Sequence, residues 1–249
     1  MAKSKGFSFR KKRQAAPPDE LGGFMDGGLA ILDVEGNRVH VTPSKVAASL
    51  RYFLARVQLH DSDGLPTRLA VTSALVGEGV TYITRSLAAV LAYDTLASVV
   101  VVDLNWRRPK DEPAEDVRGL ADTIEADVPL DEVIFPTSNP RLSLVPAGAV
   151  PLARRPALAS GTALAEALDE LEQRFDYMLL DLPPVLVTSE AMNLSQFADS
   201  YVLVVRQGAT SEAQVEAALE EMQGGDVLGV ILNRFDSSIP KRIRRLVGT

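Results

Sequence analysis

The sequence predicts an α/β fold with a mostly parallel, doubly wound sheet that is covered by helices on both faces. The runs 98–103 and 177–181 are apolar without alternation, which is typical of strands that are buried on both faces. Segments with helical spacing of apolar residues separate the strands, and such crossovers build parallel sheets. Both runs end in an aspartate, Asp103 or Asp181. Ligands of parallel sheets bind at that edge, so we expect a site there.

The elements follow from these patterns in chain order. Residues 1–28 are basic and then rich in Gly and Pro, which predicts a disordered tail. Residues 29–236 are expected to form one domain, and 237–249 a basic C-terminal tail. Within the domain, the apolar spacing predicts helices at 44–60, 81–91, 164–175 and 211–222. Strands are predicted at 69–73, 98–103, 142–145, 177–181, 200–205 and 227–232.

Composition argues against several classes of function. The 249 residues contain no cysteine and only two histidines, which excludes cysteine metal sites and argues against a zinc enzyme. No run of about 18 apolar residues occurs, so no membrane-spanning helix is expected. The basic N-terminus lacks the apolar region of a secretory signal. We therefore expect a cytoplasmic protein.

Charge is distributed unevenly along the chain. Residues 1–13 hold six Lys or Arg and 241–249 hold four, both without an acidic residue. The remaining residues, 14–240, hold 16 basic and 33 acidic side chains, a net charge of −17. An acidic body does not fit a nucleic-acid groove, so no nucleic-acid partner is expected. Short basic ends suit an anionic membrane surface, with solvated tails as the alternative.

A phosphate-binding loop is predicted between a strand and a helix. Residues 71–81 read VTSALVGEGVT, where Gly77 and Gly79 allow the backbone to turn its amides inward. The helix that follows adds its own amides and dipole. Glu78 lies between the glycines, and Val80 is where the P-loop pattern G-x-x-x-x-G-K-[ST] has lysine. Thr81 occupies the position whose hydroxyl binds Mg²⁺.

Two further motifs carry carboxylates at strand ends. Residues 99–109 read VVVVDLNWRRP and residues 175–184 read FDYMLLDLPP. Asp103 and Asp181 can hold Mg²⁺ directly or through water, with Thr81 as a third ligand. For each aspartate alone, an ordinary strand-end cap is the alternative.

In these motifs the chain resembles the bacterial tyrosine kinases of capsule and exopolysaccharide systems, which have a P-loop fold. The resemblance spans residues 44–236 and includes LVPAG at 144–148, VVRQGAT at 204–210 and VLGVILN at 227–233. It implies ATP and Mg²⁺ as cofactors and Asp103, Asn105 and Asp181 at catalytic positions. Asn233 matches the position at which related partitioning-type ATPases contact adenine.

The site departs from the family pattern at two positions. Val80 replaces the phosphate-binding lysine, and Asn105 replaces the second aspartate of D-A-D-L-R-R-P. An Asn amide cannot accept a proton at neutral pH. We therefore expect impaired catalysis and weak or absent binding of ATP and Mg²⁺. A substitute cation could come from Arg85, Arg107 or Arg108.

Assembly and acceptor elements depart as well. The family's ring-forming E-x-x-R-x-x-R element is Ala48-x-x-Arg51-x-x-Leu54 here, so no family-type ring is expected. The family's C-terminal tyrosine cluster is missing, since the last of five tyrosines is Tyr201.

Three functions remain open from the sequence. The first is a kinase-like regulatory protein of capsule or exopolysaccharide biosynthesis with impaired catalysis. Its partner would be a membrane polysaccharide chain-length regulator or an active paralogous kinase, and residues 1–13 would hold it at the inner face of the cell membrane. The second is an active, ATP-dependent tyrosine kinase that uses a substitute cation. The third is a partitioning-type ATPase switch, against which the Arg-Arg-Pro and Asp-Leu-Pro-Pro elements argue.

Overall fold

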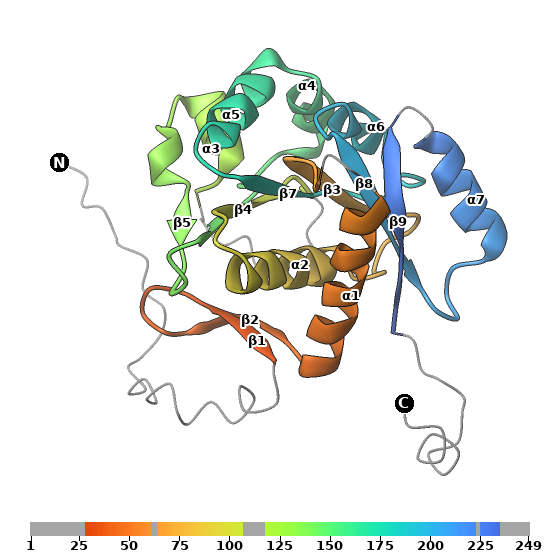
Figure 1. The fold of residues 1–249 in the computed structure, drawn as a ribbon. Coiled ribbons are helices and arrows are strands. Elements are labelled where there is room, and N and C mark those ends of the chain that lie inside the picture. The colour runs from red at the N-terminus through yellow and green to blue at the C-terminus, as the bar shows by residue number, and fades with distance from the viewer. Residues whose placement is uncertain (1–27, 61–63, 107–117, 223–224, 235–249) are drawn as a thin grey trace, which may run out of the picture.

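A seven-stranded sheet forms the centre of the protein (Figure 1). The computed structural model describes residues 28–60, 64–106, 118–222 and 225–234. The strand order is β5-β6-β4-β7-β3-β8-β9, and all neighbours run parallel except β5 and β6. The strands are β3 (Arg68–Ser73), β4 (Val99–Asp103), β5 (Phe135–Pro136), β6 (Leu142–Val145), β7 (Tyr177–Asp181), β8 (Ser200–Arg206) and β9 (Asp226–Asn233). The predicted mostly parallel sheet is confirmed.

Helices cover both faces of the sheet because its strands are apolar on both sides. One face carries α1 (Ser44–His60), α2 (Val80–Asp94) and the hairpin of β1 (Leu29–Leu32) and β2 (Arg38–Thr42). The other face carries a separate apolar core and, within the described residues, five helices. They are α3 (Leu120–Ala126), α4 (Arg155–Ala159), α5 (Thr162–Glu172), α6 (Ser189–Ser195) and α7 (Glu212–Glu221). Two 3-10 turns, η2 (Leu130–Glu132) and η3 (Leu152–Arg154), join elements on that face.

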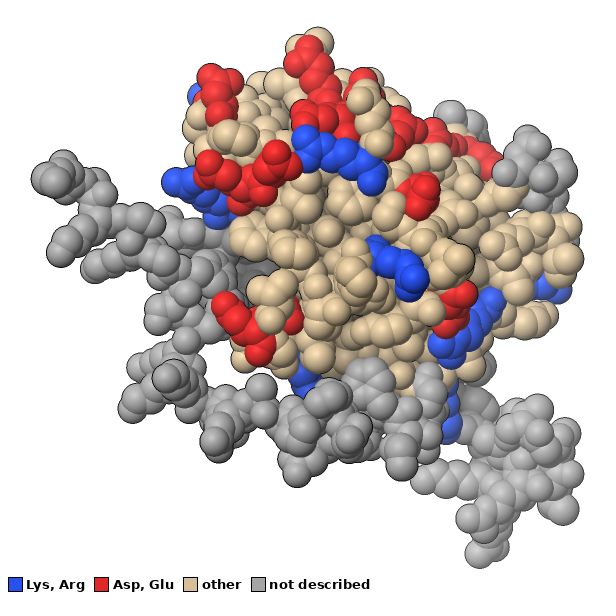
Figure 2. All heavy atoms as spheres, turned by 60° about the vertical axis from the view of Figure 1, so that its left-hand side comes forward, with Lys and Arg blue, Asp and Glu red and all other residues tan. Residues whose placement is uncertain are grey.

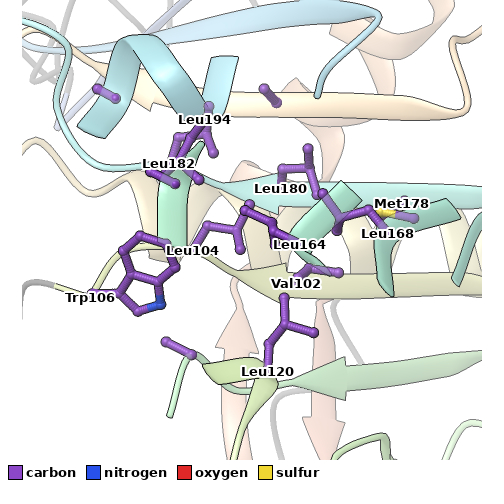
Figure 3. Packing of buried hydrophobic residues seen from close by; sticks show 14 of the residues in the cluster. Val102, Leu104, Trp106, Leu120, Leu164, Leu168, Met178, Leu180, Leu182 and Leu194 are labelled. Atoms are coloured by element: carbon purple, nitrogen blue, oxygen red, sulfur yellow. The ribbon is translucent and has the colours of Figure 1, made fainter. Parts of the chain in front are cut away.

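The apolar core on the face of α3 to α7 extends to the carboxyl ends of β4 and β7. Leu104 and Trp106 follow β4 directly and are buried with Leu182, which follows β7 (Figure 3). The amide of Leu104 donates to the carbonyl of Asp181 over 3.0 Å. Apolar packing beyond the last residues of β4 and β7 thus fixes the two strand ends against each other.

The β1–β2 hairpin packs outside α2. The Tyr93 hydroxyl donates to the carbonyl of Ala30, and Asp33 forms a bridge with Thr137 beside β5. The predicted tails at 1–28 and 237–249 lie outside the described residues, apart from Gly28, so this division of the chain stays a prediction. Among the helices of the described ranges, none is long and apolar enough to cross a lipid bilayer.

On the face shown in Figure 2, basic side chains lie among the acidic ones, and several arginines of the described residues form ion pairs. Arg68 contacts Asp169 and Glu172 of α5, each over 2.5 Å. Arg174 pairs with Asp131 and Glu170, Arg118 with Glu132, and Arg154 with Glu125. These partly exposed ion pairs each contribute little to stability.

Candidate functional site

The phosphate loop, defined here as residues 74–79, connects the buried strand β3 to α2. Gly77 and Gly79 have φ angles of +80° and +95°, in the left-handed region that favours glycine. A Cβ atom on Gly79 would lie 2.2 Å from the side-chain nitrogen of Asn233, so only glycine fits there. The loop leads into the N-terminus of α2, whose first free amides and dipole favour an anion. The strand–loop–helix context that the sequence predicted is present.

Val80 is the first residue of α2 and packs into the core. Its side chain is 7% exposed and belongs to the apolar cluster that includes Val202 and Val204 of β8. The position at which the resembling kinases have lysine thus contributes an apolar contact to the sheet. It places no positive charge beside the loop.

Asp103 and Asp181 converge with Thr81. The two aspartates are register partners on β4 and β7, and the Thr81 hydroxyl hydrogen-bonds to Asp181. Asp181 is 1% exposed, and its Oδ1 has no hydrogen-bond partner among the described residues. Burial, followed by the charge of Asp103, raises the pKa of Asp181 to about 8. The three predicted metal ligands therefore meet at one place.

A divalent cation fits this donor set. Mg²⁺ prefers oxygen ligands and takes one or two carboxylates together with phosphate oxygens. Asp103 and Asp181 supply carboxylates, and Thr81 supplies a hydroxyl. In the described ranges, no group of three or more His, Asp or Glu side chains is close enough to hold a metal. A cation bound here would relieve the repulsion between the two aspartates.

Asn105 lies beside this carboxylate pair. Its backbone amide donates to Oδ1 of Asp103 over 2.9 Å, which orients that carboxylate. Its side chain is half-buried. Because an amide has no proton-accepting capacity at neutral pH, Asn105 cannot supply general-base catalysis.

Among the described residues, Arg85 is the cationic side chain that acts on the carboxylate pair of Asp103 and Asp181. It lies one helical turn after Thr81 on α2, and its charge lowers the pKa of Asp181. The same charge, after burial, lowers the pKa of His40 on β2 to about 4. Arg85 is thus within electrostatic range of the site. Arg107 and Arg108 lie outside the described residues.

Asn233 contacts the main chain of Glu78, a residue of the phosphate loop. The Asn233 side-chain nitrogen donates to the Glu78 carbonyl over 2.7 Å. The Glu78 carboxylate is 2% exposed and accepts from the amides of Leu75 and Arg206 and from the Thr210 hydroxyl. The Glu78 carboxylate is therefore enclosed by protein, whereas Asn233 is half-buried, and nucleotide contacts by Glu78 and Asn233 stay predictions.

Two sets of contacts near the site do not follow from the sequence pattern. His40 contacts the Ser86 hydroxyl over 2.9 Å, and Thr42 donates to the same oxygen over 3.0 Å, which joins β2 to α2. No local pattern announces such a contact between a hairpin and a helix. Thr210 and Glu78 both lie in sequence motifs that match the family, which marks them as candidate site residues. The spacing of these motifs does not show that the two residues contact each other.

Comparison with known proteins agrees with this geometry. A family model described as "Cellulose biosynthesis protein BcsQ" matches residues 67–242. The chain is 29% identical over 212 residues to the tyrosine-protein kinase CpsD of Streptococcus agalactiae, covering 81% of this chain and 92% of that protein. It is 26% identical over 208 residues to the tyrosine-protein kinase YwqD of Bacillus subtilis, covering 80% and 86%.

A solved structure extends the likeness to three dimensions. The BceF tyrosine kinase domain superposes with a TM-score of 0.64 at 27% identity, covering 75% of this chain and 76% of that domain. The resemblance to bacterial tyrosine kinases that the motifs indicated is confirmed. The chain belongs to the P-loop family described as cellulose biosynthesis protein BcsQ, and bacterial tyrosine kinases of the CpsD type are its homologues.

Proposed function

We propose that this protein is a kinase-like regulatory protein of capsule or exopolysaccharide biosynthesis whose phosphotransfer is impaired. The observation that carries the proposal is Val80, an apolar core residue at the position of the phosphate-binding lysine. Phosphoryl transfer depends on positive charge that stabilises the transferred group. Loss of one such contact costs about 3–4 kcal/mol, or about 10²–10³ in rate.

Asn105 supports the proposal independently. General-base catalysis contributes about 10²–10⁴ in rate, and an amide at this position supplies none. The two losses act on one step and need not multiply. Either alone would make turnover slow compared with an active homologue.

Nucleotide binding is a separate matter from catalysis. The left-handed glycines, the start of α2 and the carboxylate pair remain, and the free Oδ1 of Asp181 is available to a cation. We therefore propose weak binding of Mg-nucleotide, with Thr81, Asp103 and Asp181 as the metal ligands. The site would then act as a sensor or a structural element rather than as a catalyst.

The surface of α1 supports action with a different partner rather than in a family-type ring. Arg51 is paired with Asp94 of α2 over 2.5 Å, and Leu54 is buried in the core. Ala48 is exposed and carries no charge. Ala48 and Leu54 therefore lack the charges of the family's ring element, and the charge of Arg51 is paired within this chain. We propose a membrane chain-length regulator or an active paralogous kinase as the partner.

One observation favours a second candidate, an active tyrosine kinase. Arg85 acts electrostatically on Asp181, so it could serve as a substitute cation. Helical side chains lean towards the N-terminus, which is the direction of the phosphate loop.

Incubation of the full chain with Mg-ATP, followed by mass spectrometry, tests the two candidates. The proposal expects no phosphotyrosine on this chain or on an added tyrosine peptide. Stoichiometric phosphotyrosine that disappears in Arg85→Ala would establish the second candidate instead.

A further inference from the structure

Glu78 is a buried carboxylate that the proposed function leaves unused. Its side chain is 2% exposed, yet within the described ranges it makes no ion pair with Lys or Arg. A buried charge is costly unless hydrogen bonds compensate it. The donors that surround Glu78 therefore have to be held in place for the fold to tolerate it.

Those donors come from two segments far apart in the chain. The Leu75 amide, inside the phosphate loop, donates to Oε2 over 2.8 Å. The Arg206 amide, at the end of β8, donates to Oε1 over 3.2 Å, and the Thr210 hydroxyl donates to the same oxygen. A single carboxylate thus connects the phosphate loop to the β8–α7 connection, defined here as residues 206–211.

A second contact binds the loop at its main chain. Asn233, at the end of β9, donates its side-chain nitrogen to the Glu78 carbonyl over 2.7 Å, and its own carbonyl accepts from the Gln207 amide over 3.1 Å. The missing Cβ of Gly79 provides the space for Asn233. The phosphate loop and the β8–α7 connection are therefore joined by two sets of hydrogen bonds. One set is made by the Glu78 carboxylate, and the other runs from the Glu78 carbonyl through Asn233.

The connection leads directly into α7. Thr210 is followed by Ser211, whose hydroxyl accepts from the Gln214 amide and caps the helix. A shift of Thr210 would therefore displace the residue that starts α7. α7 lies at the outside of the sheet beside β8 and β9, so a displacement there reaches the surface (Figure 1).

We infer that Glu78 is a positioning residue that couples the phosphate loop to the β8–α7 connection, so that occupancy of the loop and the position of α7 depend on each other. The ligand arm of this inference rests on the proposed function, because it assumes a phosphate-bearing ligand at the loop. The coupling itself is a property of the ligand-free protein. Since coupling between two sites is reciprocal, a change at Thr210 must alter the loop even though Thr210 lies outside it.

Thr210→Val and Thr210→Ser form a matched pair that tests the coupling. Valine keeps the shape and removes the hydroxyl, whereas serine keeps the hydroxyl that Glu78 accepts. In ligand-free full-length protein, hydrogen exchange of the Leu75 amide should be at least about tenfold faster in Thr210→Val and close to wild type in Thr210→Ser. A role confined to fold stability would instead change exchange across the whole core together with the melting temperature.

A second arm measures the ligand. The chain has a single tryptophan, Trp106, three residues after Asp103 and 5% exposed, so its fluorescence reports on the site. In a titration with Mg-ADP, Thr210→Val should weaken binding about fivefold or more, within the usual range of coupling, and Thr210→Ser should not. With Glu78→Gln added, the further loss from Thr210→Val should largely vanish, because the two residues act through one contact.

The two arms separate the inference from the proposed function. If wild type does not bind Mg-ADP, the proposed nucleotide site is wrong, and the exchange of the Leu75 amide still decides the coupling. If Leu75 exchange is the same in wild type, Thr210→Val and Thr210→Ser, the coupling is wrong, whatever the affinity for nucleotide.

Discussion

Asp103 and Asp181 are register partners at the carboxyl ends of β4 and β7, and the Thr81 hydroxyl bonds to the more deeply buried of the two. Parallel strands in register bring their ends to the same edge of the sheet, and here they bring two carboxylates together. The repulsion between them and the burial of Asp181 mean that the protein without a cation is under electrostatic strain at neutral and alkaline pH.

Asp181→Asn should therefore stabilise the ligand-free protein as pH rises. The pKa of Asp181 is raised from 3.8 to about 8, so the folded state holds its proton more tightly than the unfolded state. The stability that protonated Asp181 contributes to the folded state is fully present below pH 3.8. It declines as pH rises and is lost above about pH 8. The advantage of Asp181→Asn should grow by roughly 1 kcal/mol per pH unit between pH 5 and 8.

Thermal unfolding at several pH values measures this difference. Asp103→Asn is the matched control and should show a smaller trend, because burial contributes more than Asp103 to the raised pKa. A pH-independent difference between wild type and Asp181→Asn would contradict the burial of an uncompensated carboxylate.

His40 should make the protein less stable at mildly acidic pH. Burial and the charge of Arg85 lower its pKa from 6.5 to about 4, so the neutral ring is preferred in the folded state. The stability from neutral His40 is fully present above pH 6.5 and is lost as pH falls through about 4. Since the ring is partly solvated, about 1 kcal/mol is expected between pH 7 and 5, or about 2–4 °C in melting temperature.

His40→Gln should remove this part of the pH dependence. The chain has one other histidine, His60, so His60→Gln is the control and should keep the wild-type slope. An unchanged slope in His40→Gln would show that a different group causes the loss at low pH.

The α1 helix should not support a self-closed ring. Light scattering at micromolar concentration should give a monomer, a dimer or a mixed assembly with a partner. Restoring the family's charge at Leu54 with Leu54→Arg should cost several kcal/mol, because the side chain is 6% exposed and packs in the core. The exposed Ala48→Glu should be close to neutral. A stable octamer of the wild-type chain would refute the prediction.

The basic N-terminal residues should bring the protein to anionic membranes. Residues 1–13 hold six Lys or Arg with Phe7 and Phe9 among them, and each cation near an anionic leaflet is worth about 1 kcal/mol. Deletion of residues 1–13 should abolish co-sedimentation with anionic vesicles, and added salt should weaken binding of the full chain. Replacing Phe7 and Phe9 with Ser keeps the charge and measures the aromatic part. If the full chain ignores anionic vesicles at low salt, recruitment must come from a protein partner.

The sequence predicted the sheet well because its strands are buried on both faces. The segments 142–145 and 177–181 coincide with β6 and β7, and the predicted helix 44–60 coincides with α1. Continuous apolar runs have few alternatives in a chain of this size. The convergence of Asp103, Asp181 and Thr81 was predictable for the same reason, since it follows from strand ends and one helix start.

Elements held by tertiary contacts were missed. The β1–β2 hairpin is short and half exposed, and it depends on α2 through Ser86 and Tyr93 rather than on its own pattern. The short helices α3, α4 and α6 have five to seven residues, too few for periodicity to stand out. The burial of Glu78 could not be predicted from the sequence either, because its partners at 206 and 210 are more than 120 residues away along the chain.

Calorimetric titration with Mg-ADP of wild type, Val80→Lys and Val80→Met tests the central claim most directly. Lysine restores the missing charge, and methionine adds a similar length without charge. We expect Val80→Lys to bind at least about tenfold more tightly than wild type, and Val80→Met to bind like wild type. Wild type that already bound as tightly as Val80→Lys would contradict the loss of the phosphate-binding charge, and loss of that affinity in Arg85→Ala would identify Arg85 as the substitute cation.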